Sequence, residues 1–122
     1  MKSSKHKKLQ ALIKKYYATL GYIAFEEYDV NGKQIDVLAQ DIKTKHIIAN
    51  EVELSARHCL ENIKRDLKVG CSEVVIICED RATLEAIKQK TRLNLDKNML
   101  CKVRYRIIRD FVPHARIRNN TE

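Results

Sequence analysis

The chain has 122 residues, of which 44% are hydrophobic and 33% are charged, and its formal net charge is +8. This length and balance predict one globular domain, residues 1–122, and exclude a second hydrophobic core. No run of about 18 apolar residues is available to cross a bilayer, and the start MKSSKHKKLQ lacks the apolar segment of a secretory signal. We therefore expect no membrane partner and a cytoplasmic location. The excess of Lys and Arg favours a polyanionic partner, with nucleic acid ahead of an anionic membrane surface.

The first half of the chain predicts one helix followed by three strands. Apolar residues recur at helical spacing through residues 4–20, which predicts an amphipathic helix with a lysine-rich outer face that ends at Gly21. The segment YIAFEEYDVNGKQIDVLAQ then predicts two strands joined at Asn31-Gly32, a strong short signal for a β-hairpin. Residues 46–54 predict a third strand.

The second half predicts two more strands, each preceded by a helix. Ser55 is a candidate N-cap for a helix over about 56–69, and Gly70 is placed to end that helix. Residues 73–78, EVVIIC, form a continuous apolar run, which predicts a parallel and central strand covered on both faces. A helix is predicted next, over about 80–92. The alternating segment KVRYRII then predicts a last strand with one basic face or edge.

Three carboxylates lie in the most strand-like part of this basic chain. Asp36 is on the second predicted strand, and Glu51 and Glu53 are on the third. Side chains alternate between the two faces of a strand, so Glu51 and Glu53 point the same way, roughly 6 to 7 Å apart. Strand periodicity alone is equally consistent with solvated acids balanced by lysines across the sheet.

These residues, in this order of elements, resemble the PD-(D/E)XK (restriction-endonuclease-like) nuclease superfamily, and particularly its small Holliday-junction-resolvase-like members. The family carries an Asp near the second strand and an acidic-x-Lys sequence on the third. IDVLA supplies Asp36 and NEVELS supplies Glu51, with 14 residues between them. The resemblance covers about residues 4–108 and leaves a basic C-terminal tail at 109–122. It implies a single-domain α/β fold, α-β-β-β-α-β-α-β, with a mixed central sheet flanked by helices.

The resemblance also implies a metal-dependent DNA endonuclease or a resolvase-type phosphodiester hydrolase. Mg²⁺ or Mn²⁺ prefers oxygen ligands, and Asp36, Glu51 and the Val52 carbonyl would supply them. Such a cation lowers the pKa of a bound water and neutralises charge on the phosphoryl oxygens. A metal would explain why carboxylates gather in a chain suited to bind DNA.

Glu53 stands where the family usually has lysine, and three interpretations follow. In an E-x-E form of the site, Glu53 acts on the attacking water as a ligand or general base. Alternatively, the missing cation comes from Lys33, Lys64 or Arg65. The third interpretation is a catalytically inactive nuclease-fold module that binds nucleic acid or a protein partner. Glu26 or Glu27 on the first predicted strand would replace the glutamate that many relatives carry on their first helix.

Basic residues of the first helix and the last strand are candidates for contact with DNA. They are Lys5, Lys8, Lys15, Arg104 and Arg106. Few aromatic residues alternate with these charges in the sequence, which disfavours recognition of single strands by stacking. A core of this size leaves little chain for reading bases, so recognition of the backbone or of DNA shape is expected. A homodimer is left open as a further partner.

Overall fold

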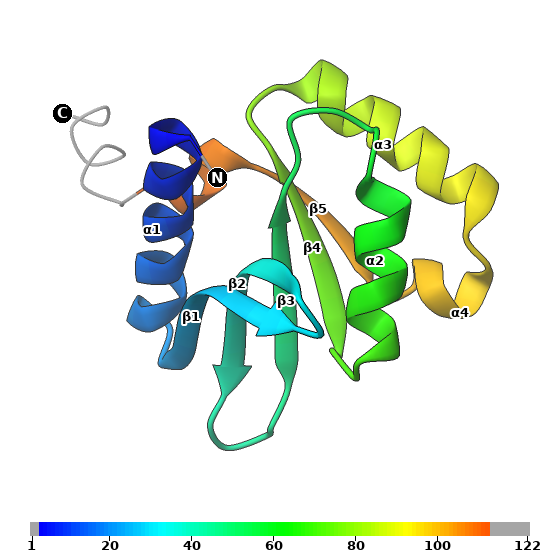
Figure 1. Cartoon of the computed structure of the whole chain (residues 1–122). Coiled ribbons are helices and arrows are strands. Elements are labelled where there is room, and N and C mark those ends of the chain that lie inside the picture. Colours follow the sequence, from blue (N-terminus) through cyan, green and yellow to red (C-terminus); the bar gives the residue numbers. More distant parts are fainter. Residues whose placement is uncertain (1–2, 113–122) are drawn as a thin grey trace, which may run out of the picture.

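The computed structural model describes residues 3–112, and it contains one five-stranded mixed sheet with helices against both faces (Figure 1). The α/β class and the predicted order of helices and strands are confirmed, and α4 and the 3₁₀ helix η1 are additional. In chain order the elements are α1 (Ser4–Thr19), β1 (Tyr22–Val30), β2 (Lys33–Asp41), β3 (Ile47–Val52), α2 (Cys59–Lys68), β4 (Glu73–Cys78), α3 (Arg81–Asn94), α4 (Lys97–Leu100), β5 (Val103–Ile107) and η1 (Ile108–Phe111).

The strands lie in the order β1-β2-β3-β4-β5. β1, β2 and β3 pair antiparallel, whereas β3, β4 and β5 pair parallel. The apolar run in β4 is therefore a parallel strand, as predicted, although the central position belongs to β3. Val75 of β4 packs on one face of the sheet and Ile76 on the other, which is why this strand shows no polar alternation.

The hydrophobic core of this single domain lies in two layers, one on each face of the sheet. Ile13 and Tyr17 of α1 are buried against one face, together with Phe111 of η1. Ile63 of α2 and Ile87 of α3 are fully buried against the other face. Figure 1 shows α1 on one side of the sheet and α2 and α3 on the opposite side. We call these the α1 face and the α2 face.

The β1–β2 hairpin turns at Asn31-Gly32, as predicted. Both residues have positive φ, 50° and 85°, which is the conformation that a tight two-residue turn between twisted strands requires. The hairpin also bends in its middle, where Glu27 has a φ of 51°. Ile35 packs on the α2 face but Val37 packs on the α1 face, so the usual alternation of side chains breaks between them. The bend places Asp36 at this break.

Several boundaries differ from the sequence predictions. The third strand, predicted to run to residue 54, ends at Val52, so Glu53 directly follows β3. Helix α2 begins at Cys59, three residues later than expected, because the hydroxyl of Ser55 accepts the N–H of Arg57 within the loop and does not cap the helix. Phe111 is buried in the core, so residues 109–112, assigned to the basic tail, belong to the folded part. Residues 113–122 of that tail lie outside the described residues. Among residues 3–112, no helix combines the length and apolar character needed to cross a bilayer.

Candidate active site

Asp36 is held at the bend of the hairpin by three polar groups. The residue is only 4% exposed. Oδ2 accepts the backbone N–H of Val52 at 2.8 Å, Oδ1 accepts Nε2 of Gln10 at 3.2 Å, and His6 Nε2 lies 3.0 Å from Oδ1. His6 and Gln10 are one helical turn apart on α1, so the first helix reaches the predicted site.

Glu51 and Glu53 are the neighbours of Val52 in the sequence. The hydrogen bond from the Val52 N–H to Asp36 therefore brings Asp36 close to both glutamates. Both glutamates are buried, with exposures of 2% and 7%. Helix α2 supplies a partner to each: Arg65 Nη2 lies 2.7 Å from Oε2 of Glu51, and Asn62 Nδ2 donates to Oε2 of Glu53 at 2.8 Å. The three predicted acids therefore gather at the carboxyl end of β3.

Asp66 adds a fourth carboxylate, which was not expected from the sequence. It is fully buried, and its Oδ1 accepts Nε of Arg65 at 2.9 Å. Its Oδ2 is buried with no hydrogen-bond donor among the described residues. Since Glu51 lies beside Asp66, a proton held by Glu51 would supply the missing donor. A buried oxygen without a donor is costly, so this position favours either a proton or a cation.

Burial is the main cause of raised pKa values for Glu51, Glu53 and Asp66. Burial raises the pKa of Glu51 well above its ordinary value, and the neighbouring carboxylates of Asp66 and Asp36 raise it further. Burial also raises the pKa of Glu53 to about 7, against a lowering by the Asn62 hydrogen bond. The pKa of Asp66 is raised by burial, although Arg65 opposes this change. One guanidinium faces several acids, and each acid makes ionisation of the others less favourable.

The donor chemistry of the cluster suits Mg²⁺ or Mn²⁺, but its side chains are not arranged as a ready coordination shell. Within the described part of the chain, no three His, Cys, Asp or Glu side chains lie close enough to hold a metal ion together. Asp36 is turned to α1 and Val52, Glu51 is turned to Arg65, and Glu53 is turned to Asn62. A cation would therefore have to displace protein donors, above all the Arg65 guanidinium on Glu51. The buried oxygen of Asp66 is the group that a cation would satisfy best.

The other predicted site residues are placed as follows. Arg65 is the cation that reaches the acids, whereas Lys33 is exposed beside the hairpin turn. Lys64 is exposed on α2 and faces a hollow lined by Asp96 and Asn98 of the α4 region. Neither lysine forms an ion pair with an acid among residues 3–112. Glu27 is half-buried at the bend, and Val52 contributes its N–H to Asp36.

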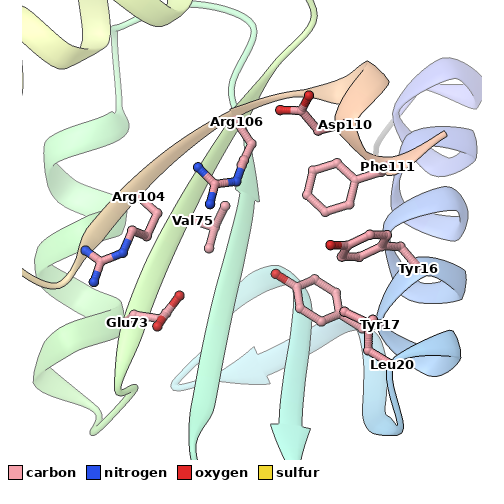
Figure 2. A pocket seen from close by; sticks show the side chains of 9 residues that line it. All are labelled: Tyr16, Tyr17, Leu20, Glu73, Val75, Arg104, Arg106, Asp110 and Phe111. Carbon is pink, nitrogen blue, oxygen red and sulfur yellow. The ribbon is translucent and has the colours of Figure 1, made fainter.

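The candidate DNA-binding residues lie on the α1 side of the sheet. Lys8 and Lys15 are exposed on α1, and Lys5 forms an exposed ion pair with Glu79 at 3.1 Å. Arg104 and Arg106 are exposed on β5 and line a hollow of about 120 Å³ together with residues of α1 and η1 (Figure 2). Neither arginine has an acidic partner within ion-pair distance among the described residues.

Aromatic side chains also line this hollow, which the sequence pattern did not indicate. Tyr16 and Tyr17 come from α1, far from Arg104 in the sequence, and Phe111 comes from η1, which directly follows β5. Their rings pack edge to face, with centroids 4.8 Å apart for Tyr16 and Phe111. The charged groups that line this hollow are the guanidiniums of Arg104 and Arg106 and the carboxylates of Glu73 and Asp110.

The raised pKa of Glu53 predicts that chelator-treated protein loses stability as the pH rises. The folded state keeps a proton on Glu53 up to about pH 7, whereas the unfolded chain releases it near 4.5. The free energy of unfolding should therefore fall between these values, by at most about 3 kcal/mol. Urea unfolding at pH 5 and pH 8 measures this fall. Glu53→Gln should make the fall in the free energy of unfolding smaller, whereas the exposed control Glu61→Gln should leave it unchanged. An equal fall in the wild type and both variants would contradict the assignment to Glu53.

The geometry has two features that bear on function: the buried acids between β2, β3 and α2, and the basic hollow beside α1. Helix α1 supplies His6 and Gln10 to the first feature, and helix α2 supplies Asn62 and Asp66. Comparisons with protein-family models, with curated proteins and with solved structures gave no match for this chain.

Proposed function

We propose that the chain is a metal-dependent DNA endonuclease or resolvase-type phosphodiester hydrolase with a restriction-endonuclease-like fold. The observation that supports this proposal is the convergence of Asp36, Glu51 and Glu53, all buried, at one end of β3 in a chain of net charge +8. Burying several carboxylates together is unfavourable unless a proton or a cation compensates them. Mg²⁺ or Mn²⁺ is the compensation that also supports phosphodiester hydrolysis.

In this proposal each acidic residue has a separate task. Asp36 and Glu51 would hold the cation, with the Val52 carbonyl as a third oxygen. When bound, the cation would neutralise charge on the phosphoryl oxygens and lower the pKa of a bound water. Glu53, directly after β3, orients or deprotonates the attacking water. Arg65, which contacts Glu51 in this structure, would be available to contact a phosphate oxygen if Glu51 held a cation.

A second candidate function is a binding module with the same fold and no catalysis. The observation that favours it is the 2.7 Å contact between Arg65 and Glu51, which already compensates part of the acidic charge without a metal. The two candidates differ in one assay. Cleavage of linear, nicked, single-stranded or four-way-junction DNA that requires Mg²⁺ or Mn²⁺ and stops with EDTA supports the enzyme. DNA binding without cleavage of any of these substrates supports the module.

Both candidates place the DNA backbone on the basic α1 side, and this placement predicts a salt-dependent affinity. The logarithm of the binding constant should fall with the logarithm of salt concentration by about 0.9 for each phosphate contacted. Arg104→Ala with Arg106→Ala should weaken binding to all sequences about equally and reduce the slope by about 2. Fluorescence anisotropy over a salt series measures both quantities.

The matched control for this prediction removes the same charge from the opposite side. Arg81 and Arg92 are exposed on α3, so Arg81→Ala with Arg92→Ala changes the net charge equally. For this control, the salt dependence of the DNA-binding constant should stay near that of the wild type. Equal losses in both double variants would show that only net charge matters and would contradict a defined basic track. A second copy of the chain is the other partner that we propose.

A further inference from the structure

One nitrogen of Arg65 lies between two buried carboxylates. Its Nη2 is 2.7 Å from Oε2 of Glu51 and 2.9 Å from Oδ1 of Asp66. The side chains of Glu51 and Asp66 are 3% and 0% exposed, so solvent does little to screen their charges. This nitrogen therefore marks a point in the protein at which one positive centre is shared by two acids.

The positive charge at this point is smaller than the negative charge around it. When both acids are ionised, Glu51 and Asp66 carry two negative charges, and Arg65 supplies one positive charge. A buried charge without compensation is unfavourable. A divalent cation at the same point would compensate both acids. Proteins usually hold Mg²⁺ with one or two carboxylates, because water and substrate phosphate complete its shell. Two acids are therefore enough, although residues 3–112 contain no group of three His, Cys, Asp or Glu side chains suited to a metal.

Asp66 also has an oxygen that lacks a partner. Among residues 3–112, two buried side-chain oxygens have no hydrogen-bond partner: Oδ2 of Asp66 and Oε1 of Gln10, whose amide nitrogen donates to Asp36. Asp36 differs, because Gln10 donates to its Oδ1 and Val52 donates to its Oδ2. Asp66 is thus the acid beside Glu51 that has an oxygen still available to a cation.

We propose that Asp66 is a ligand of the cation together with Glu51, and that Arg65 occupies the cation position in the metal-free protein. Arg65 is suited to leave, because its side chain is 17% exposed and so reaches solvent. Its Nε and Nη2 are both 2.9 Å from Oδ1 of Asp66, so its departure makes both oxygens of Asp66 available. This inference rests on the proposed function, since it assigns two further residues to the same metal site.

A proton on Glu51 is the alternative to a cation between these acids. It would give Asp66 a donor and remove one negative charge. The two alternatives differ in their consequences for metal binding. If a proton alone compensates the acids, replacing Asp66 or Arg65 has no effect on the affinity for Mn²⁺.

Calorimetric titration with Mn²⁺ in the absence of DNA tests both assignments. Asp66→Asn keeps the shape of the side chain and should weaken Mn²⁺ binding at least about tenfold, because a charged ligand is lost. Arg65→Gln should strengthen Mn²⁺ binding at least about threefold, because the protein no longer competes for the cation position. The matched controls are exposed residues of the same helix. Glu61→Gln and Lys64→Gln remove the same charges and should leave the affinity near that of the wild type.

Circular dichroism verifies that the variants are folded, since both substitutions change a buried ion pair. If Arg65→Gln does not fold without metal, Mn²⁺ should restore its fold, because a cation bound to the folded state stabilises that state. Failure of Mn²⁺ to restore the fold would count against the proposal. If Asp66→Asn does not fold, the result for Arg65→Gln decides.

The outcomes separate this inference from the proposed function. A folded Asp66→Asn protein that binds Mn²⁺ as tightly as the wild type would overturn the inference, as would an Arg65→Gln protein that binds it no more tightly. If Asp36→Asn and Glu51→Gln still weaken Mn²⁺ binding, the metal site remains without Asp66. Binding of Mn²⁺ that depends on Asp66 but supports no DNA cleavage would contradict only the enzyme. Absence of Mn²⁺ binding in both the wild type and Arg65→Gln would contradict the inference and the proposed function together.

Discussion

Asp36→Asn and Glu51→Gln are each expected to reduce metal-dependent DNA cleavage by about 10³-fold or more, which corresponds to about 4 kcal/mol of lost transition-state stabilisation. Both substitutions keep the shape of the side chain and remove the charge that would hold the cation. DNA affinity should stay equal or increase, because one fewer negative charge lies near the phosphates. Single-turnover cleavage and anisotropy binding, measured on the same proteins, separate the two effects.

The control for these variants is Asp29→Asn, which removes an exposed acid from β1 away from the cluster. It should retain wild-type cleavage. Thermal unfolding of all three variants tests whether a loss of cleavage comes from a loss of fold, since Asp36 and Glu51 both make buried contacts. Cleavage that persists in a folded Asp36→Asn or Glu51→Gln protein would contradict the proposed ligands.

Glu53→Lys is expected to lower cleavage by about 10²-fold or more, as is Glu53→Gln. The reason is that Glu53, directly after β3, is buried and hydrogen-bonded to Asn62 of α2, and we propose that it acts on the attacking water from there. Lysine is the residue that the resembling family carries here, so this substitution separates a working glutamate from a degenerate position. Cleavage rates at saturating Mn²⁺ provide the measurement.

The opposite result would change the interpretation of the site. A gain of cleavage in Glu53→Lys would mean that the wild-type glutamate had replaced a catalytic lysine. Absence of cleavage in both the wild type and Glu53→Lys would favour the binding module. Asn62→Ala is a useful companion variant, because it removes the hydrogen bond to Glu53 and leaves every acid in place.

The sequence predicted the strands well because their signals are local. Asn31-Gly32 specifies the hairpin turn by the backbone conformation of two residues, and the run at 73–78 specifies a strand buried on both faces. The proximity of Asp36 to Glu51 follows from pairing neighbouring strands, so it was also predictable. The bend of the hairpin was not predicted. Glu27 has no intrinsic preference for positive φ, and its conformation depends on packing beyond the hairpin.

The partners of the acids were harder to predict because they come from helices. His6 of α1 and Asp66 of α2 read as members of ordinary polar helix faces, and only the packing of each helix on the sheet turns them toward the acids. Arg65 was one of three candidate cations, and sequence alone did not distinguish it from Lys64, its neighbour on the helix. A helical periodicity indicates which face is apolar, but it does not indicate which polar residue at the border of that face becomes buried.

Calorimetric titration of the protein with Mn²⁺ tests most directly whether the buried acids form a metal site. The wild type is expected to bind Mn²⁺ at the cluster, and Asp36→Asn and Glu51→Gln are each expected to weaken this binding at least tenfold, while Asp29→Asn leaves it unchanged. Wild-type protein that binds no Mn²⁺, or that binds it with an affinity unaffected by Asp36→Asn and Glu51→Gln, would contradict the metal site and the nuclease function that depends on it.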